Sequence, residues 1–166
     1  MLLIYILSAA LIGVPAHPGA PVPTGARVSR MVEIDPSAVE EHPASFSSLS
    51  SISGYRGSKV LIVVAEYLAD PLAPQIAQLQ SDIAADGWSV EVHEMAGGGA
   101  GDLRSLLQNT ADLDGAVLVG HLPCAWFEDD YWGQEEFPCE LYLMDLDGNW
   151  HDMDMDGIQD EGEPGI

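Results

Sequence analysis

Continuous apolar runs alternate with amphipathic segments through the middle of the chain. Residues 60–65 (Val-Leu-Ile-Val-Val-Ala) form a β-branched run of the kind that is buried on both faces of a parallel sheet. Residues 88–92 alternate between apolar and polar positions, and residues 116–119 (Ala-Val-Leu-Val) form another short apolar run. The pattern therefore predicts three β-strands.

Two helices are predicted between these strands. Apolar residues recur at helical spacing from residue 72 to residue 85, and Asp86-Gly87 ends that segment. After a glycine turn at residues 97–99, Asp102 is expected to cap a second helix. The helical positions are Leu72, Ile76, Leu79 and Ile83 in the first helix and Leu103, Leu106 and Leu107 in the second.

The order β-α-β-α-β with right-handed crossovers indicates half of a doubly wound α/β domain. The expected spatial order of its strands is 2-1-3. A three-stranded parallel sheet would leave two edges and an apolar flank exposed. We therefore expect that the domain is incomplete in this chain or that a partner completes the sheet.

The segments around this βαβαβ unit, residues 59–123, differ from it in composition. Residues 1–16 are interpreted as a signal peptide, because the apolar run is too short to span a bilayer and ends in Val-Pro-Ala. They contain no Lys or Arg, so a short membrane anchor or a misassigned start is the alternative. Residues 17–58 are rich in Pro, Ser and Gly, which predicts a linker or pro-segment. Residues 124–166 form an aromatic and acidic loop region.

The charge is strongly negative and unevenly distributed. The chain has 27 Asp and Glu residues against 5 Lys and Arg, a net charge of −22. Sixteen of the acidic residues follow Arg104, and no Lys or Arg does. This C-terminal third must bind cations or suffer self-repulsion, and nucleic acid is disfavoured as a partner.

The last acidic segment has the ligand spacing of a calcium loop. Over residues 152–163, carboxylates stand at positions 1, 3, 5, 9 and 12, and Gly157 stands at position 6. Alternating Asp residues can direct their oxygens at one centre, and the last Glu can close the site with two more. We therefore expect Ca²⁺ to bind this chain. The expected ligands are Asp152, Asp154, Asp156, the Ile158 carbonyl, Asp160 and Glu163.

The residues around this loop do not favour an EF-hand. Residues 145–150 (Asp-Leu-Asp-Gly-Asn-Trp) indicate a turn rather than an entering helix, and Pro164 discourages an exiting one. A solvated acidic tail without a metal is the alternative.

Three residues after the third strand, His121, Cys124 and Cys139, are candidates for redox or catalytic chemistry. Export would favour a disulfide between Cys124 and Cys139, and two unpaired thiols packed as small hydrophobic side chains are the alternative. His121 lies at the predicted carboxyl end of the strand, where α/β sheets place catalytic groups. No nucleophile stands at a defined spacing from it, so a polar residue in a turn is favoured over a catalytic base.

Two further segments have alternative interpretations. Residues 97–101 are rich in glycine but lack the Lys and Ser/Thr of a P-loop, which favours a flexible loop over a phosphate cradle. Residues 126–132 (Trp-Phe-Glu-Asp-Asp-Tyr-Trp) are expected to form an exposed binding loop or a lid over the sheet.

Three segments together resemble the amino-terminal half of secreted bacterial gingipain-like cysteine peptidases. They are residues 115–123 (Gly-Ala-Val-Leu-Val-Gly-His-Leu-Pro), 137–150 (Phe-Pro-Cys-Glu-Leu-Tyr-Leu-Met-Asp-Leu-Asp-Gly-Asn-Trp) and 152–160 (Asp-Met-Asp-Met-Asp-Gly-Ile-Gln-Asp). The resemblance implies a caspase-like, flavodoxin-like parallel sheet, cysteine peptidase ancestry, and a place outside a bacterial cell or at its surface. A peptide or protein substrate is implied for a full-length form.

The resemblance does not supply catalytic residues to this chain. In that family the catalytic His lies in a Gly-His-Gly strand end and the Cys follows the next strand, and neither motif occurs here. We therefore expect a secreted, calcium-binding part of a peptidase domain that is inactive alone. The alternative is a non-catalytic extracellular module in which calcium stabilises residues 124–151 for binding a partner.

Overall fold

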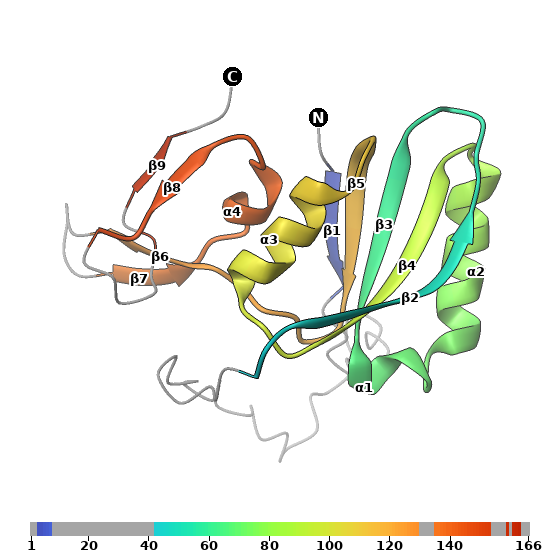
Figure 1. The fold of residues 1–166 in the computed structure, drawn as a ribbon, viewed down its shortest axis with the longest axis horizontal. Coiled ribbons are helices and arrows are strands. Elements are labelled where there is room, and N and C mark those ends of the chain that lie inside the picture. The colour runs from blue at the N-terminus through green and yellow to red at the C-terminus, as the bar shows by residue number, and fades with distance from the viewer. Residues whose placement is uncertain (1–2, 8–41, 130–134, 154–158, 160, 164–166) are drawn as a thin grey trace, which may run out of the picture.

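A twisted five-stranded sheet forms the centre of the protein. In the computed structural model, residues 3–7, 42–129, 135–153, 159 and 161–163 are described. The strands lie in the order β1-β5-β3-β4-β2 (Figure 1). β1, β5, β3 and β4 run parallel, and β2 runs antiparallel to β4. Their bounds are β1 (Leu3–Leu7), β2 (Ser45–Ile52), β3 (Lys59–Ala65), β4 (Ser89–Ala96) and β5 (Leu113–Val119).

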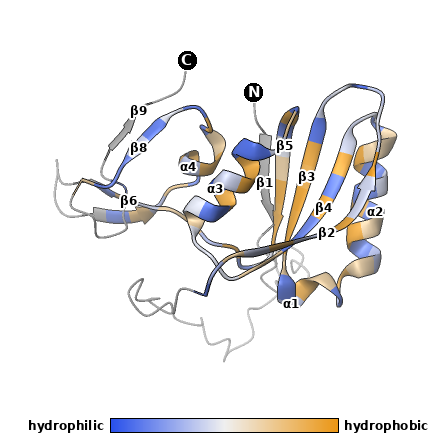
Figure 2. Ribbon diagram, viewed as in Figure 1, coloured by the Kyte–Doolittle hydropathy of each residue, from blue (hydrophilic) through white to orange (hydrophobic). Residues whose placement is uncertain are grey.

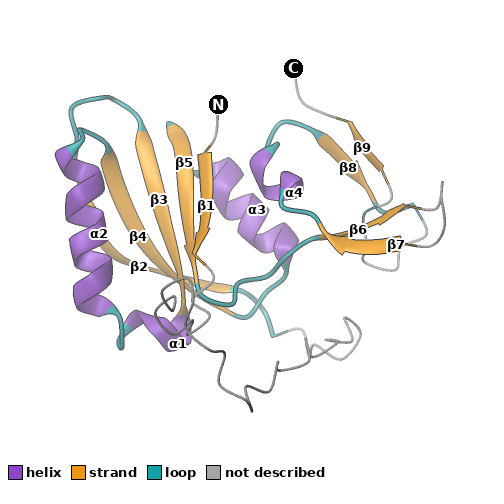
Figure 3. Ribbon diagram, turned by 180° about the vertical axis from the view of Figure 1, so that it is seen from behind, coloured by secondary structure: helices purple, strands orange, loops and turns teal. Residues whose placement is uncertain are grey.

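Helices cover both faces of the sheet. Helix α2 packs on one face, and α3 packs on the other with α4 beside it (Figure 3). The helices are α1 (Glu66–Ala69), α2 (Ala73–Ala85), α3 (Ala100–Asn109) and α4 (Leu141–Met144). Two small antiparallel pairs follow β5, namely β6 (Trp126–Asp129) with β7 (Glu135–Pro138) and β8 (Asn149–His151) with β9 (Glu161–Glu163).

The predicted βαβαβ unit is confirmed. The chain runs β3-α2-β4-α3-β5, and the spatial order β4-β3-β5 is the expected order 2-1-3. β3 explains the continuous apolar run, because Leu61 and Val63 face the α3 side while Ile62 and Val64 face the α2 side. All four side chains are fully buried, and each contributes about 1.5–3 kcal/mol relative to exposure. Figure 2 shows the resulting hydrophobic centre of the sheet.

The prediction of a linker is wrong for the serine-rich residues 45–52, which form β2. Phe46 lies opposite Met95 and Ile52 lies opposite Val90 in the ladder with β4. The Ser50 hydroxyl is 2.9 Å from Oε1 of Gln80 on α2. All eight β2 residues are exposed, so the strand has no buried face and produces no periodic apolar signal.

β1 lies inside the predicted signal peptide. Its backbone pairs in parallel with β5, with Leu3 opposite Gly115 and Leu7 opposite Val119. A signal peptide that is removed on export cannot remain in the sheet. If cleavage occurs, β5 becomes the edge of a four-stranded sheet, so the strand and the cleaved peptide are mutually exclusive interpretations of residues 3–7.

Helix α3 begins earlier than predicted. Gly99, not Asp102, is the N-cap, and Asp102 stands at the third helical position. Its Oδ2 atom accepts a hydrogen bond of 2.9 Å from the Gly99 backbone N–H, as in a capping box. The carboxylate thus satisfies a free N–H at the helix start.

Arg104 connects the sheet domain to the C-terminal region. Its guanidinium donates to four backbone carbonyls in the segment from Tyr142 to Gly148, and it stacks over the Tyr142 ring at 4.9 Å. The acceptors are Tyr142 at 2.5 Å, Asp145 at 2.7 Å, Leu146 at 3.2 Å and Gly148 at 2.8 Å. Arg104 is 7% exposed, so these carbonyls have little access to replacement water.

None of the helices among the described residues is long and apolar enough to cross a membrane.

We predict that Arg104→Ala lowers the free energy of unfolding by about 3 kcal/mol, because several buried carbonyls lose their donor. Arg56→Ala is the matched control. Arg56 donates to the Asp86 carbonyl at 2.6 Å and stacks on Trp88 at 5.1 Å, but it is exposed, so its loss should cost about 1 kcal/mol or less. Urea denaturation measures both, and equal losses in the two variants would contradict the assigned role of Arg104.

Candidate functional site

The two ends of the predicted calcium loop are held together by the β8–β9 pair. His151 lies opposite Glu161, and Asn149 lies opposite Glu163. Residues 152–160 therefore form the connection of an antiparallel hairpin. The loop is entered from a strand, which agrees with the prediction that no entering helix precedes it.

A second attachment holds the loop near its middle. The Gln159 N–H donates to the Trp126 carbonyl at 2.9 Å, and the Glu128 N–H donates to the Gln159 carbonyl at 2.9 Å. Gln159 is position 8 of the twelve-residue loop, and both partners belong to β6. The backbone of the segment is thus fixed at position 8 and again at positions 10–12.

Most of the predicted ligands lie outside the described residues. Asp154, Asp156, Ile158 and Asp160 are not described, and for Glu163 only the backbone is. Asp152 is half-buried at the end of β8. Across the part of the chain that the structure describes, no group of three or more His, Cys, Asp or Glu residues could hold a metal ion. The calcium loop therefore stays a prediction, with its flanks now defined.

The other Asp-rich turn, residues 145–148, is occupied by a side chain. Its backbone carbonyls converge on the Arg104 guanidinium. Gln108 adds a bond of 2.7 Å to the Leu146 carbonyl. Carbonyl oxygens that could ligate a cation here accept from a protein cation instead. The sequence did not predict this contact, because backbone carbonyls carry no sequence signature.

The aromatic residues after β5 pack against one another. Phe127 contacts Phe137 at 5.5 Å and Trp150 at 6.4 Å between ring centroids, and Trp150 contacts Tyr142 at 5.5 Å. The two contacts of Trp150 are edge-to-face, and such aromatic pairs add about 0.5–1.5 kcal/mol beyond their buried area. The described part of the aromatic segment thus contributes to a small satellite core, in which Phe127 is half-buried. Residues 130–132 lie outside the described residues, so the choice between a binding loop and a lid stays a prediction.

Both cysteines, which lie in the described part of the chain, are free thiols, so the predicted disulfide is not formed in the structure. The Ala125 carbonyl lies between them: it accepts from the Cys139 N–H at 2.8 Å and from the Cys124 thiol at 3.2 Å. The ladder of β6 and β7 continues with Ala125, not Cys124, opposite Cys139. Desolvation, followed by the nearby Glu140 carboxylate, raises the pKa of the Cys124 thiol.

His121 lies at the carboxyl end of β5, as predicted, and among the described residues no nucleophile is hydrogen-bonded to its side chain. Its backbone N–H donates to the Tyr67 hydroxyl at 2.9 Å, and its side chain is exposed. The Cys124 thiol donates to the Ala125 carbonyl rather than to this imidazole. The structure thus places His121 in a strand-end turn.

The glycine-rich turn has a packing role. Gly97 and Gly98 have φ values of 64° and 78°, which favour glycine. A Cβ atom on Gly98 would lie 2.4 Å from the Cβ of Ala44, and the Gly98 N–H donates to the His42 carbonyl at 2.8 Å. Because these glycines have no side chain, the segment that leads into β2 can cross the turn. This packing explains the glycines without a phosphate ligand.

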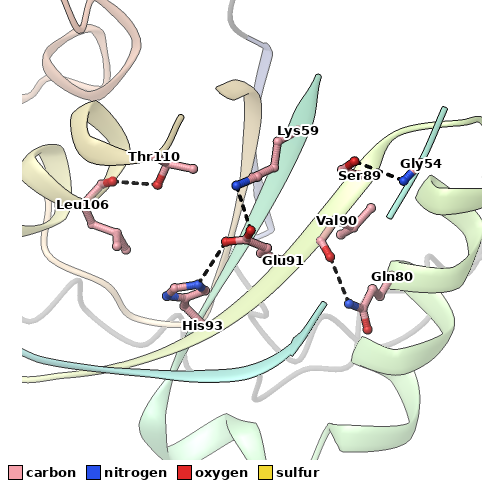
Figure 4. A network of polar contacts seen from close by, with 9 residues as sticks. All are labelled: Gly54, Lys59, Gln80, Ser89, Val90, Glu91, His93, Leu106 and Thr110. Atoms are coloured by element: carbon pink, nitrogen blue, oxygen red, sulfur yellow. Dashed lines mark hydrogen bonds and ion pairs between the residues drawn. The ribbon is translucent and has the colours of Figure 1, made fainter. Parts of the chain in front are cut away.

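A polar cluster that the sequence did not reveal lies on the α3 face of β3 and β4 (Figure 4). Lys59 Nζ is 2.7 Å from Glu91 Oε1, and His93 Nε2 is 3.5 Å from Glu91 Oε2. The hydrogen bond from Lys59 holds the pKa of Glu91 below its ordinary value of 4.5. The alternation of β4 hides this cluster, because residues two apart on one strand read as an ordinary solvent-facing stripe.

No protein family, curated protein or solved structure matches this chain.

We predict that the protein loses stability in acid as the Glu91 carboxylate becomes protonated. Its pKa is lower in the folded than in the unfolded state, so its stabilising effect is present above pH 4.5 and is lost as the pH falls through the folded-state value. Denaturation of the wild type and of Glu91→Gln from neutral to acid pH measures this difference. The gap between the two should narrow below pH 4.5, and a gap that widens there would contradict the assignment.

We predict that Cys124 reacts slowly with alkylating agents at neutral pH, because its raised pKa keeps the thiol protonated. Mass spectrometry of Cys139→Ser, in which only Cys124 can be labelled, gives the rate, and the rate should rise with pH. His121→Ala in the same background is the control and should leave the rate unchanged. Rapid labelling that depends on His121, together with peptide hydrolysis, would establish a functional thiol–imidazole pair instead.

Proposed function

We propose that this protein binds Ca²⁺ through residues 152–163. The observation that carries the proposal is the spacing of five carboxylates at positions 1, 3, 5, 9 and 12, with glycine at position 6. Ca²⁺ takes six to eight oxygen ligands, and this loop offers five carboxylates and a backbone carbonyl. Mg²⁺ fits less well, because it prefers six ligands in a strict octahedron and retains several waters.

The described flanks support this proposal through the entropy of loop closure. The β8–β9 pair brings the two ends of the segment together, and the bonds of Gln159 to β6 restrain its later half. A loop with fixed ends loses less conformational freedom when it closes around an ion. The proposed site is therefore a calcium-binding hairpin connection rather than an EF-hand.

Electrostatics supports a cation on this segment as well. Residues 152–163 contain six acidic residues and no basic one. Arg104 is the last Lys or Arg before this segment. Its guanidinium donates to backbone carbonyls and not to these carboxylates. Repulsion among the carboxylates opposes a compact loop until a divalent ion neutralises part of the charge.

We further propose that the chain is related to gingipain-like cysteine peptidases and is inactive by itself. The parallel order β4-β3-β5 and the strand end Val119-Gly120-His121 support the relationship. The turn around His121 and the protonated state of Cys124 support inactivity. An open reading frame beyond Ile166 that encodes Gly-His-Gly and a later Cys would favour the relationship to these peptidases. A stop codon there would favour the alternative, a non-catalytic extracellular module that binds a partner.

We predict that Ca²⁺ stabilises the protein and that its binding depends on particular carboxylates. Millimolar Ca²⁺ should raise the melting temperature above that in EDTA, because a ligand of the native state stabilises it by mass action. Asp156→Ala, at position 5, should weaken binding by about tenfold or more. Glu161→Ala, at position 10, removes the same charge from a non-liganding position and is the matched control.

Calorimetric titration measures the affinity of each variant. Identical melting curves in Ca²⁺ and EDTA, together with no saturable heat, would rule out the site. Equal losses in Asp156→Ala and Glu161→Ala would mean that net charge, and not a defined ligand set, attracts the ion.

A further inference from the structure

Strand β2 has one backbone edge that no other described strand pairs with. It is the last strand in the sheet order and pairs only with β4. All eight of its residues are exposed. The N–H and C=O groups along the outer edge of such a strand are a template for pairing with a further strand.

The sequence of β2 lacks the usual protection of an edge strand. No charged residue occurs from Ala44 to Tyr55, and no proline occurs within β2. Proteins commonly place lysine, proline or a bulge on such edges, and here only a bulge is present, between Ser48 and Ser50. Three apolar side chains are exposed along the strand: Phe46 at 36%, Leu49 at 48% and Ile52 at 37%.

The charge distribution makes this edge the place where two copies of an acidic chain can approach. No acidic residue occurs from Ala44 to Ala65, and that stretch includes Arg56 and Lys59. Helix α2, which packs beside β2, carries Asp82 as its one charged residue. The β6–β9 region is rich in acidic residues, and it lies beyond α3 and β1, on the other side of the molecule from α2 and the carboxyl end of β2 (Figure 1).

We propose that β2 is a homodimer interface, in which two copies pair their β2 edges antiparallel about a twofold axis and form one continuous sheet. A twofold contact uses the same patch on both copies, and an uncharged strand is complementary to itself. The arrangement keeps the two acidic regions far apart. It depends on described residues of the sheet and is independent of calcium binding.

The interface is small, so the dimer should be reversible and sensitive to salt. Two strands of this length bury less area than the roughly 1,600 Å² typical of stable complexes. Each copy carries a net charge of −22, so long-range repulsion opposes association. Salt screens that repulsion beyond about 10 Å at 0.1 M, and the dimer should therefore tighten as salt is raised.

Sedimentation equilibrium of the full chain tests the proposal. The weight-average mass should rise from monomer to dimer with protein concentration, and more steeply at about 0.5 M than at about 0.05 M NaCl. Leu49→Lys places like charges near the twofold axis and should weaken the dimer by about tenfold or more. Leu141→Lys adds the same charge at an apolar side chain that is 54% exposed on α4, and should leave the dimer unchanged.

Hydrogen exchange of the wild type tests the same interface without a variant. Amides of residues 45–52 should gain protection at concentrations where the dimer forms, while those of α4 should not. A protein that stays monomeric at every protein and salt concentration would overturn the proposal. The β2 edge would then be available to pair with a strand from another protein. A dimer that resists Leu49→Lys, or that dissociates as salt rises, would overturn it as well.

Discussion

The C-terminal region of this protein depends on one buried cation. Arg104 projects from α3 and donates to four carbonyls of the following turn, and its guanidinium stacks on Tyr142. From Tyr142 the contacts pass to Trp150 in β8 and then to Phe127 in β6. These are the two strands that hold the proposed calcium loop. Arg104, together with Gln108 and the packing of Leu143 against the core, thus links these strands to the sheet.

The chain has two acidic turns, and the contact with Arg104 distinguishes the first from the second. Residues 145–148 and 152–156 both alternate Asp with apolar residues, so composition alone predicts a cation at each. At the first turn, the convergent groups are backbone carbonyls and the cation is a guanidinium. The second turn carries three carboxylates, Asp152, Asp154 and Asp156, and no Lys or Arg follows Arg104 in the sequence. There we propose a dissolved divalent ion, and not a side chain, as the counter-charge.

The sequence predicted the elements whose burial produces a pattern. β3 is buried on both faces, and α2 has one buried face, so periodicity located both. The sequence did not predict β2, because this strand buries no side chain and is held by its backbone ladder and the Ser50–Gln80 contact. The sequence did not predict the role of Arg104 either. Its partners are backbone atoms some forty residues away, and backbone carbonyls carry no sequence signature.

The carboxyl edge of the sheet, where α/β proteins usually bind ligands, is crowded by its own backbone turns. At the end of β5, a Cβ atom on Gly120 would lie 2.6 Å from Leu68 and 3.0 Å from Ala65. At the end of β4, a Cβ atom on Gly97 would lie 2.9 Å from the His42 carbonyl. Glycine is needed at both strand ends because other segments pass so close. Neighbouring segments thus fill the sheet edge at these two strand ends, and the proposed calcium loop lies instead between β8 and β9, outside the sheet.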